Sequence, residues 1–218
     1  FKSRIYDLSL NSTNIRPFLC QPNDPAPGNV EAANALFQGR FAFGGEEKSV
    51  LNEAPWILAG ASDAWIMEAN SFEWLSHFQA TNGETARLRA LELVRSWIEV
   101  NKRWQKRIWR SDIIGRRLAS WACHGVFLLD GAEPTFRRNF LKSFEIQTRH
   151  LRRVNAFLPK RRATLPAVAG HVIAEIVLDG VSKRLESDLH LLKEQLSRDI
   201  SPDGTPKSRN ACDSILAL

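Results

Sequence analysis

The spacing of apolar side chains constrains the fold of this chain more than any other feature of its sequence. Between Phe136 and Leu158, a stripe of apolar residues with Gln147 among them recurs every three or four positions, which places these residues on one face of an α-helix. Pro134 suits the first turn of such a helix, whereas Pro159 cannot continue it. The sequence therefore predicts one long amphipathic helix from about Pro134 to Phe157.

The same period recurs through most of the chain beyond Pro55. No stretch there shows strong two-residue alternation bounded by turn residues, so the fold class predicted for this part is nearly all α. Before the long helix, we expect one helix from Ser62 or Asp63 to Thr81-Asn82-Gly83, one from Glu84 to about Trp104, and one that follows the N-cap Ser111 and carries an apolar stripe to Leu129. After it, the stretch from Leu165 to Leu178 is apolar nearly all round, which predicts a buried helix. A last helix is marked by Leu185 to Leu196, and Pro202-Asp203-Gly204 ends it.

The first 55 residues show no such period, because several prolines and the turn Gly44-Gly45 interrupt them. Short strands fit best around Arg40 to Phe43. We therefore divide the chain into an irregular segment, residues 1–55, and a helical domain, residues 56–218. Helices of this length joined by short turns form antiparallel hairpins, which stack as a bundle, a solenoid or a toroid, and periodicity does not choose among the three.

The charge of the chain favours anionic partners without identifying them. Thirty basic residues against twenty-four acidic ones give a net charge of +6, which leaves nucleic acid, acidic glycan and anionic membrane open. No apolar run approaches the roughly 20 residues that span a bilayer, and the start of the chain has no hydrophobic signal core. We expect a soluble chain without a membrane span, in either the periplasm or the cytoplasm.

The three cysteines, Cys20, Cys123 and Cys212, show no metal-ligand spacing and are odd in number. We therefore expect buried free thiols, no metal site and no cofactor. The chain has no initiator Met and ends in the apolar run Ile215-Leu216-Ala217-Leu218, so we also expect further protein on both sides of it.

Several stretches occur in an order that resembles bacterial heparinase II/III-like proteins, and together they are more specific than any one alone. The resemblance covers roughly residues 37 to 218. The matching stretches are Phe41-Ala42-Phe43-Gly44-Gly45, Pro55-Trp56, Phe72-Glu73-Trp74-Leu75, Trp97-Ile98, Gly115-Arg116-Arg117-Leu118-Ala119-Ser120-Trp121-Ala122-Cys123-His124 and Asp203-Gly204-Thr205-Pro206-Lys207-Ser208-Arg209-Asn210.

The resemblance implies an incomplete α/α toroid followed by a C-terminal β-sandwich domain, which this chain lacks, with an acidic polysaccharide bound in the cleft between them. It also implies β-elimination beside a uronic acid. In that reaction one group neutralises the carboxylate, a base such as Tyr or His removes the C5 proton, and an acid protonates the departing oxygen.

The lyase pattern is incomplete in this chain. Lyases of the family resemble one another in an Asn-His pair that starts an inner helix and is followed by a Glu; here the matching residues are Gly170, His171 and Glu175. The family's Tyr-His pair falls at Asp213-Ser214 when the Asp-Gly stretch is matched without gaps. Because two expected groups are replaced, we predict that the isolated chain is inactive.

The resemblance nevertheless nominates pocket residues. His171 and Asn210 are the catalytic candidates, and the substrate-binding candidates are Arg116, Arg117, His124, Glu175 and Arg209. These candidates also have plainer interpretations. His171 and Glu175, four residues apart, can form a polar pair inside a buried helix, one of the two arginines can form a salt bridge between helices, and His124 can pack at a helix edge. In the stretch that contains Arg209 and Asn210, Ser208 can simply cap the final helix.

A run between Lys102 and Arg110 mixes cations with Trp104 and Trp109, a combination that sugar-binding and nucleic-acid surfaces both use. No nucleic-acid motif accompanies it, so we do not expect nucleic acid as the partner. Two hypotheses follow: the helical domain of a heparinase II/III-like polysaccharide lyase that binds acidic glycan for elimination in the complete protein, or a noncatalytic helical binding or scaffold module.

Overall fold

The structure is a computed structural model, and it describes residues 6, 9–10, 15–50, 54–56, 58–157, 163–180 and 183–207. Helices dominate the described residues, so the prediction of a mostly all-α fold is confirmed. Whether the hairpins belong to a toroid stays a prediction. The helices after the N-terminal segment are α3 Asp63–Ser71, α4 Leu75–Ala80, α5 Glu84–Val100, α6 Ser111–Cys123, α7 Gly125–Leu129, α8 Pro134–Phe157, α9 Leu165–Asp179 and α10 Lys183–Asp199.

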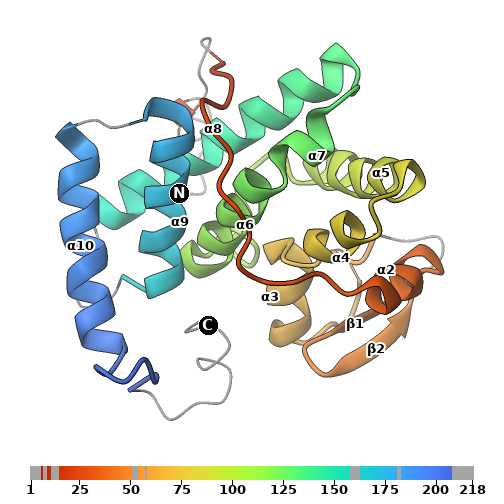
Figure 1. Cartoon of the computed structure of the whole chain (residues 1–218), viewed down its shortest axis with the longest axis horizontal. Coiled ribbons are helices and arrows are strands. Elements are labelled where there is room, and N and C mark those ends of the chain that lie inside the picture. The colour runs from red at the N-terminus through yellow and green to blue at the C-terminus, as the bar shows by residue number, and fades with distance from the viewer. Residues whose placement is uncertain are drawn as a thin grey trace.

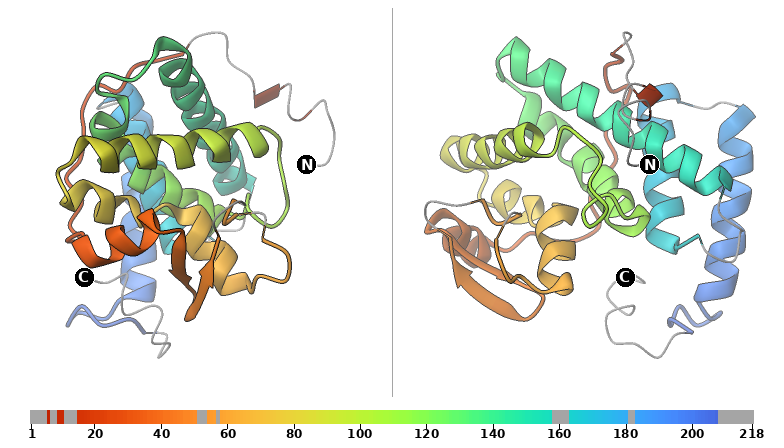
Figure 2. Two further views of the ribbon diagram at one scale, coloured as in Figure 1. Left: turned by 90° about the vertical axis from the view of Figure 1, so that its right-hand side faces the viewer. Right: turned by 180° about the vertical axis from the view of Figure 1, so that it is seen from behind.

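The N-terminal segment contains more regular structure than its sequence predicts. Helix α2, Val30–Phe37, begins at Asn29, whose side chain accepts a hydrogen bond from the backbone N–H of Ala32. The strands β1, Arg40–Phe43, and β2, Glu46–Ser49, form an antiparallel hairpin whose turn is Gly44-Gly45, both at positive φ. Figure 2 shows α2 and this hairpin on the opposite side of α5 and α6 from α8.

The predicted helix from residue 63 to residue 80 is broken in two. Phe72 adopts the left-handed conformation, with φ 64° and ψ 13°, and thereby ends α3 before α4 begins. The third predicted helix is also divided, at His124, whose φ of −105° and ψ of 12° separate α6 from α7. Helix α5 stops at Val100 rather than near Trp104, because the side chain of Asn101 donates to the backbone oxygen of Trp97.

An aromatic cluster lies where these broken helices meet. The ring of Phe72 contacts Trp97 at 5.6 Å and Trp121 at 5.4 Å between centroids, and Trp121 stacks on Phe140 at 4.8 Å. All four side chains are fully buried. Burying rings of this size and pairing them edge to face stabilises the centre of the molecule, which offsets the left-handed strain at Phe72.

Helix α9 lies between α6 and α10, and α10 forms the outer edge of the layer (Figure 1). Nine of the fifteen residues of α9 are buried, as predicted from the apolar composition of this helix. The backbones of α6 and α9 approach so closely that a Cβ placed on Gly170 would lie 2.0 Å from the Gly115 oxygen. Glycine at both positions is therefore a requirement of this helix crossing.

An extended strap, residues 15–28, runs across α6, α8 and α9 toward α2 (Figure 1). Its Phe18 packs against Phe144 at 4.7 Å between ring centroids, and its Leu19 donates a backbone hydrogen bond to the Val177 oxygen. Arg16 pairs with Glu145 on α8 and also with Asp179 on α9. The strap thus ties the early part of the chain to the late helices. Within the described residues, we find no helix that is both long and apolar enough to span a membrane.

Candidate functional site

The catalytic candidate His171 lies in a buried polar cluster between α8, α9 and α10. Its Nε2 is 3.3 Å from Oε1 of Glu175, and its Nδ1 is 3.6 Å from Oδ2 of Asp188 on α10. Arg152 on α8 donates from Nε to the same Glu175 oxygen at 3.0 Å. The structure therefore brings together His171 and Glu175, as their spacing predicts, and adds partners from two further helices.

The electrostatics of this cluster favour helix packing over proton transfer. Burial raises the pKa of Glu175, but hydrogen bonds from His171 and Arg152 and the charge of Arg152 outweigh it and bring the pKa down to about 2. Such a carboxylate is a weak base at neutral pH. His171 and Glu175 are only 2% and 1% exposed, so neither presents a surface to a polysaccharide.

The heparinase resemblance predicts an asparagine-equivalent position at Gly170, but the helix crossing leaves no space for a side chain there. Any side chain at residue 170 would overlap the backbone of Gly115. The carboxylate-neutralising group implied by the family resemblance therefore has no room at this position.

The two adjacent arginines point in different directions. Arg117 is completely buried: its guanidinium stacks 4.2 Å from the centroid of the Trp97 ring and donates to Gln147 and to the backbone oxygens of Asn70 and Ile108. Burial lowers its pKa to about 9. Arg116 instead pairs with the half-exposed Glu73 at 3.0 Å. Arg117 thus has no free surface for a glycan in this structure, and its geometry is that of a packing residue.

Among the sequence candidates, His124 is placed beside an open pocket of about 400 Å³. The strap forms one wall, and α4 and the C-terminal end of α6 form the other. The lining residues are Gln21, Pro22, Asn23, Asp24, Ala26, Gly28, Ser76, Gln79, Ala80, Cys123 and His124.

The imidazole of His124 is fixed from both sides. Its Nδ1 lies 2.5 Å from the side-chain oxygen of Gln79, and its Nε2 lies 3.0 Å from Oδ2 of Asp24. The neighbouring Cys123 is a poor nucleophile, because burial and the charge of Asp24 raise its pKa to about 11. Asp24 and Gln79 were not identified from the sequence, since they meet His124 only through contacts over long sequence separations.

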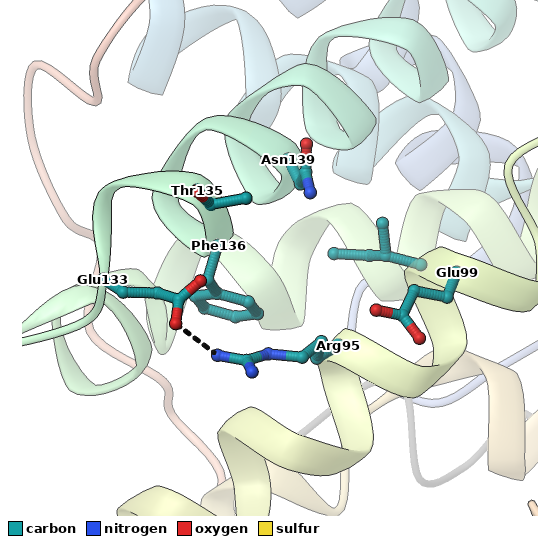
Figure 3. A pocket seen from close by; sticks show the side chains of 7 residues that line it. Arg95, Glu99, Glu133, Thr135, Phe136 and Asn139 are labelled. Atoms are coloured by element: carbon teal, nitrogen blue, oxygen red, sulfur yellow. Dashed lines mark ion pairs between the residues drawn. The ribbon is translucent and has the colours of Figure 1, made fainter.

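A smaller pocket of about 90 Å³ lies between α5 and α8 (Figure 3). Arg95 forms an ion pair with Glu133 at 3.6 Å, and its guanidinium lies over the ring of Phe136. Glu99, on the same helix as Arg95, also lines this pocket. Its volume is too small for a sugar ring, so we assign it no ligand.

Among the described residues, the loop between α5 and α6 carries a concentrated group of exposed cations. Lys102, Arg103 and Lys106 are exposed and form no ion pair with another described residue. Arg107 and Arg110 in the same loop pair with Asp63 and Asp112. Trp104, partly buried, lies among these cations, and we call residues 102–107 the cationic loop.

The remaining candidates cannot be placed. Arg209, Asn210, Asp213, Ser214 and Cys212 lie outside the described residues. Cys20 is a free thiol, but it is exposed, so the expectation of a buried thiol is wrong there, whereas Cys123 is buried as expected. Within the part of the chain that the structure describes, no group of three or more His, Cys, Asp or Glu is arranged to hold a metal.

The chain is similar to FtsZ-localized protein C of Caulobacter vibrioides (strain NA1000 / CB15N), with 27% identity over 177 residues. The match covers 78% of this chain but only 30% of that protein, so the chain spans less than a third of its relative. The chain matches no protein-family model. No solved structure matches it either.

Proposed function

We propose that this chain is a noncatalytic helical module that binds acidic, uronic-acid-containing glycan, on a frame that resembles heparinase II/III-like proteins. The observation that carries the proposal is the cationic loop, where Lys102, Arg103 and Lys106 have no competing carboxylate among the described residues. Cations next to an aromatic side chain can attract carboxylates or sulfates and also contact the apolar face of a sugar ring.

The proposed role is binding rather than elimination because the candidate His171, together with Glu175, serves helix packing. His171 and Glu175 are buried in an ion cluster, and residue 170 has no space for a side chain. Elimination needs a neutraliser, a base and an acid held around one sugar unit. Lyase activity in a longer protein remains a proposal that depends on groups contributed from outside the described residues.

The test is calorimetric titration with heparin-like and alginate-like oligosaccharides against a neutral glycan. The variant Lys102→Ala/Arg103→Ala/Lys106→Ala should weaken acidic-glycan binding by about tenfold or more, because a tenfold change needs only about 1.4 kcal/mol. Added salt should weaken the wild-type interaction as well, since exposed charges are screened. The same mixtures should show no growth of unsaturated-uronate absorbance.

The matched control is Arg138→Ala/Lys142→Ala/Lys193→Ala, which removes the same charge from exposed positions on α8 and α10. Equal weakening by both triple variants would show nonspecific charge attraction, and equal binding of neutral glycan would remove the case for acidic ligands. Tighter binding of single-stranded nucleic acid than of either glycan would also contradict the proposal.

The similarity to FtsZ-localized protein C favours a second candidate, a module that associates with FtsZ. Co-sedimentation with polymerised FtsZ tests it directly. Pelleting of this chain only in the presence of FtsZ polymer would support the candidate, and recovery in the supernatant at every polymer concentration would exclude it.

A further inference from the structure

The pocket at His124 is preformed by contacts on both sides of it. Gln21 accepts a hydrogen bond from the backbone N–H of Val126 at 2.7 Å, and the backbone N–H of Asn29 donates to His77 at 3.1 Å. Between these anchors, Gly28 lies so close to α4 that a Cβ on it would be 2.0 Å from the Ser76 oxygen. The strap wall is therefore fixed before any ligand arrives, which reduces the entropy lost on binding.

The charge of this pocket is opposite to that of the cationic loop. Its lining contains the carboxylate of Asp24 and no lysine or arginine. The imidazole of His124 is turned toward Asp24 and Gln79 and is 2% exposed, so it offers a ligand almost no contact surface of its own. An anionic sugar is disfavoured here, and a cationic or donor-rich ligand is favoured.

Asp24 is positioned to receive such a ligand. One of its oxygens accepts from His124 at 3.0 Å and the other from the backbone N–H of Ala26 at 2.9 Å, which leaves lone pairs on both oxygens. Its side chain is 24% exposed. Burial raises the pKa of Asp24, but the hydrogen bonds from His124 and Ala26 outweigh this and leave the pKa below its usual range, so the group is ionised at neutral pH.

We propose that the His124 pocket binds a small polar ligand with a primary ammonium group, of about the size of one amino-sugar ring. Asp24 pairs with the ammonium, and the side-chain amides of Gln21, Asn23 and Gln79 face the ligand's hydroxyl groups. His124 acts as a positioning residue that orients the carboxylate. This site is separate from the cationic loop and does not depend on acidic-glycan binding.

The test uses glucosamine as the probe, with N-acetylglucosamine and glucose as matched ligands without the ammonium group. In ¹⁵N-correlated spectra, glucosamine should shift the side-chain amide signals of Gln21, Asn23 and Gln79. N-acetylglucosamine and glucose should bind about tenfold more weakly, because one charge-assisted hydrogen bond is lost.

The variant Asp24→Asn keeps a side chain that can bond to His124 but removes the charge. It should lower glucosamine affinity by about tenfold, whereas Asp130→Asn, an exposed aspartate outside the pocket, should leave it unchanged. Glucosamine binding should also persist when the three cations of the cationic loop are replaced, which separates this proposal from the glycan proposal. Equal affinity for the three sugars, shifts located elsewhere, or an unaffected Asp24→Asn variant would overturn it.

Discussion

Arg117 illustrates how a single residue that resembles a binding group can serve the core instead. Its guanidinium has no exposed surface, and it donates to Gln147 at 2.5 Å and to the Asn70 oxygen at 2.9 Å. The charge is stabilised by these acceptors and by the face of Trp97, and no carboxylate of a described residue pairs with it. The sequence shows two adjacent arginines, but only packing decides that Arg116 reaches the half-exposed Glu73 and that Arg117 points into the core.

Arg117→Ala should therefore lower the free energy of unfolding by about 3 to 5 kcal/mol, because it leaves buried acceptors without a donor and opens a cavity. Arg116→Ala is the matched control. It should cost less than about 1 kcal/mol, since the Arg116–Glu73 pair is partly solvated. Urea unfolding of both variants gives the comparison. If Arg117→Ala were as stable as Arg116→Ala yet bound acidic glycan more weakly, the packing role would be wrong.

At the scale of elements, α6 and α9 cross at a very close backbone contact. A Cβ on Gly115 would lie 2.0 Å from the Pro166 oxygen, and one on Gly170 would lie 2.0 Å from the Gly115 oxygen. The neighbours are backbone atoms of helices, which cannot move aside as a flexible side chain can. The two helices would have to separate to admit any larger residue.

Gly170→Ala and Gly170→Asn should each destabilise the fold by about 3 kcal/mol or more, because overpacking at a rigid crossing displaces a whole helix. Gly170→Asn supplies the residue type of the family's lyases, but it should not produce lyase activity. Gly83→Ala is a suitable control, since the nearest atom to its added Cβ is 3.8 Å away, and it should cost less than about 1 kcal/mol. If thermal unfolding gave Gly170→Asn the same stability as Gly83→Ala, the helix crossing would be shown to relax around a side chain.

The sequence predicts some elements closely and others poorly, for identifiable reasons. Helix α8 was predicted from Pro134 to Phe157, because its stripe is long and prolines mark its ends. The break at Phe72 was missed, because a phenylalanine in the left-handed conformation carries no turn signal and is held there by its burial. Helical spacing correctly placed His171 beside Glu175, but the additional partners Arg152 and Asp188 depend on tertiary packing.

At the scale of the whole molecule, buried titratable groups make stability depend on pH. His150 on α8 lies against Trp109 at 5.2 Å between ring centroids, and its Nδ1 is 2.6 Å from the hydroxyl of Tyr6. Burial, together with the nearby charges of Arg117 and Arg153, lowers its pKa to about 4, against a raising contribution from the backbone of Trp109. His150 is therefore neutral in the folded protein at pH values where the unfolded chain begins to bind a proton.

This sets two windows of acid sensitivity. The pKa of His150 is about 4 in the folded protein and 6.5 in the unfolded chain. Its contribution to the free energy of unfolding is therefore complete above about pH 6.5 and is lost as the pH falls toward 4. The carboxylate of Glu175, with a pKa of about 2 against 4.5, contributes stability above pH 4.5 that is lost as the pH falls toward 2. On acidification, the stabilising contribution of His150 should thus be lost first. The contribution of Glu175, in the polar cluster between α8, α9 and α10, should be lost at lower pH.

His150→Gln should flatten the pH dependence of the unfolding free energy between pH 6.5 and 4, by an amount of order 3 kcal/mol for the 2.5-unit shift. The variant can be less stable than wild type at neutral pH, since Gln does not reproduce the ring contacts, so the slope with pH is the quantity to compare. Glu175→Gln should leave this slope intact and alter only the lower window. Urea titrations at half-unit pH steps measure both. An unchanged slope for His150→Gln would place the acid sensitivity elsewhere, whereas a flattened slope in that variant alone would show that one buried imidazole sets the response of the whole fold to mild acid.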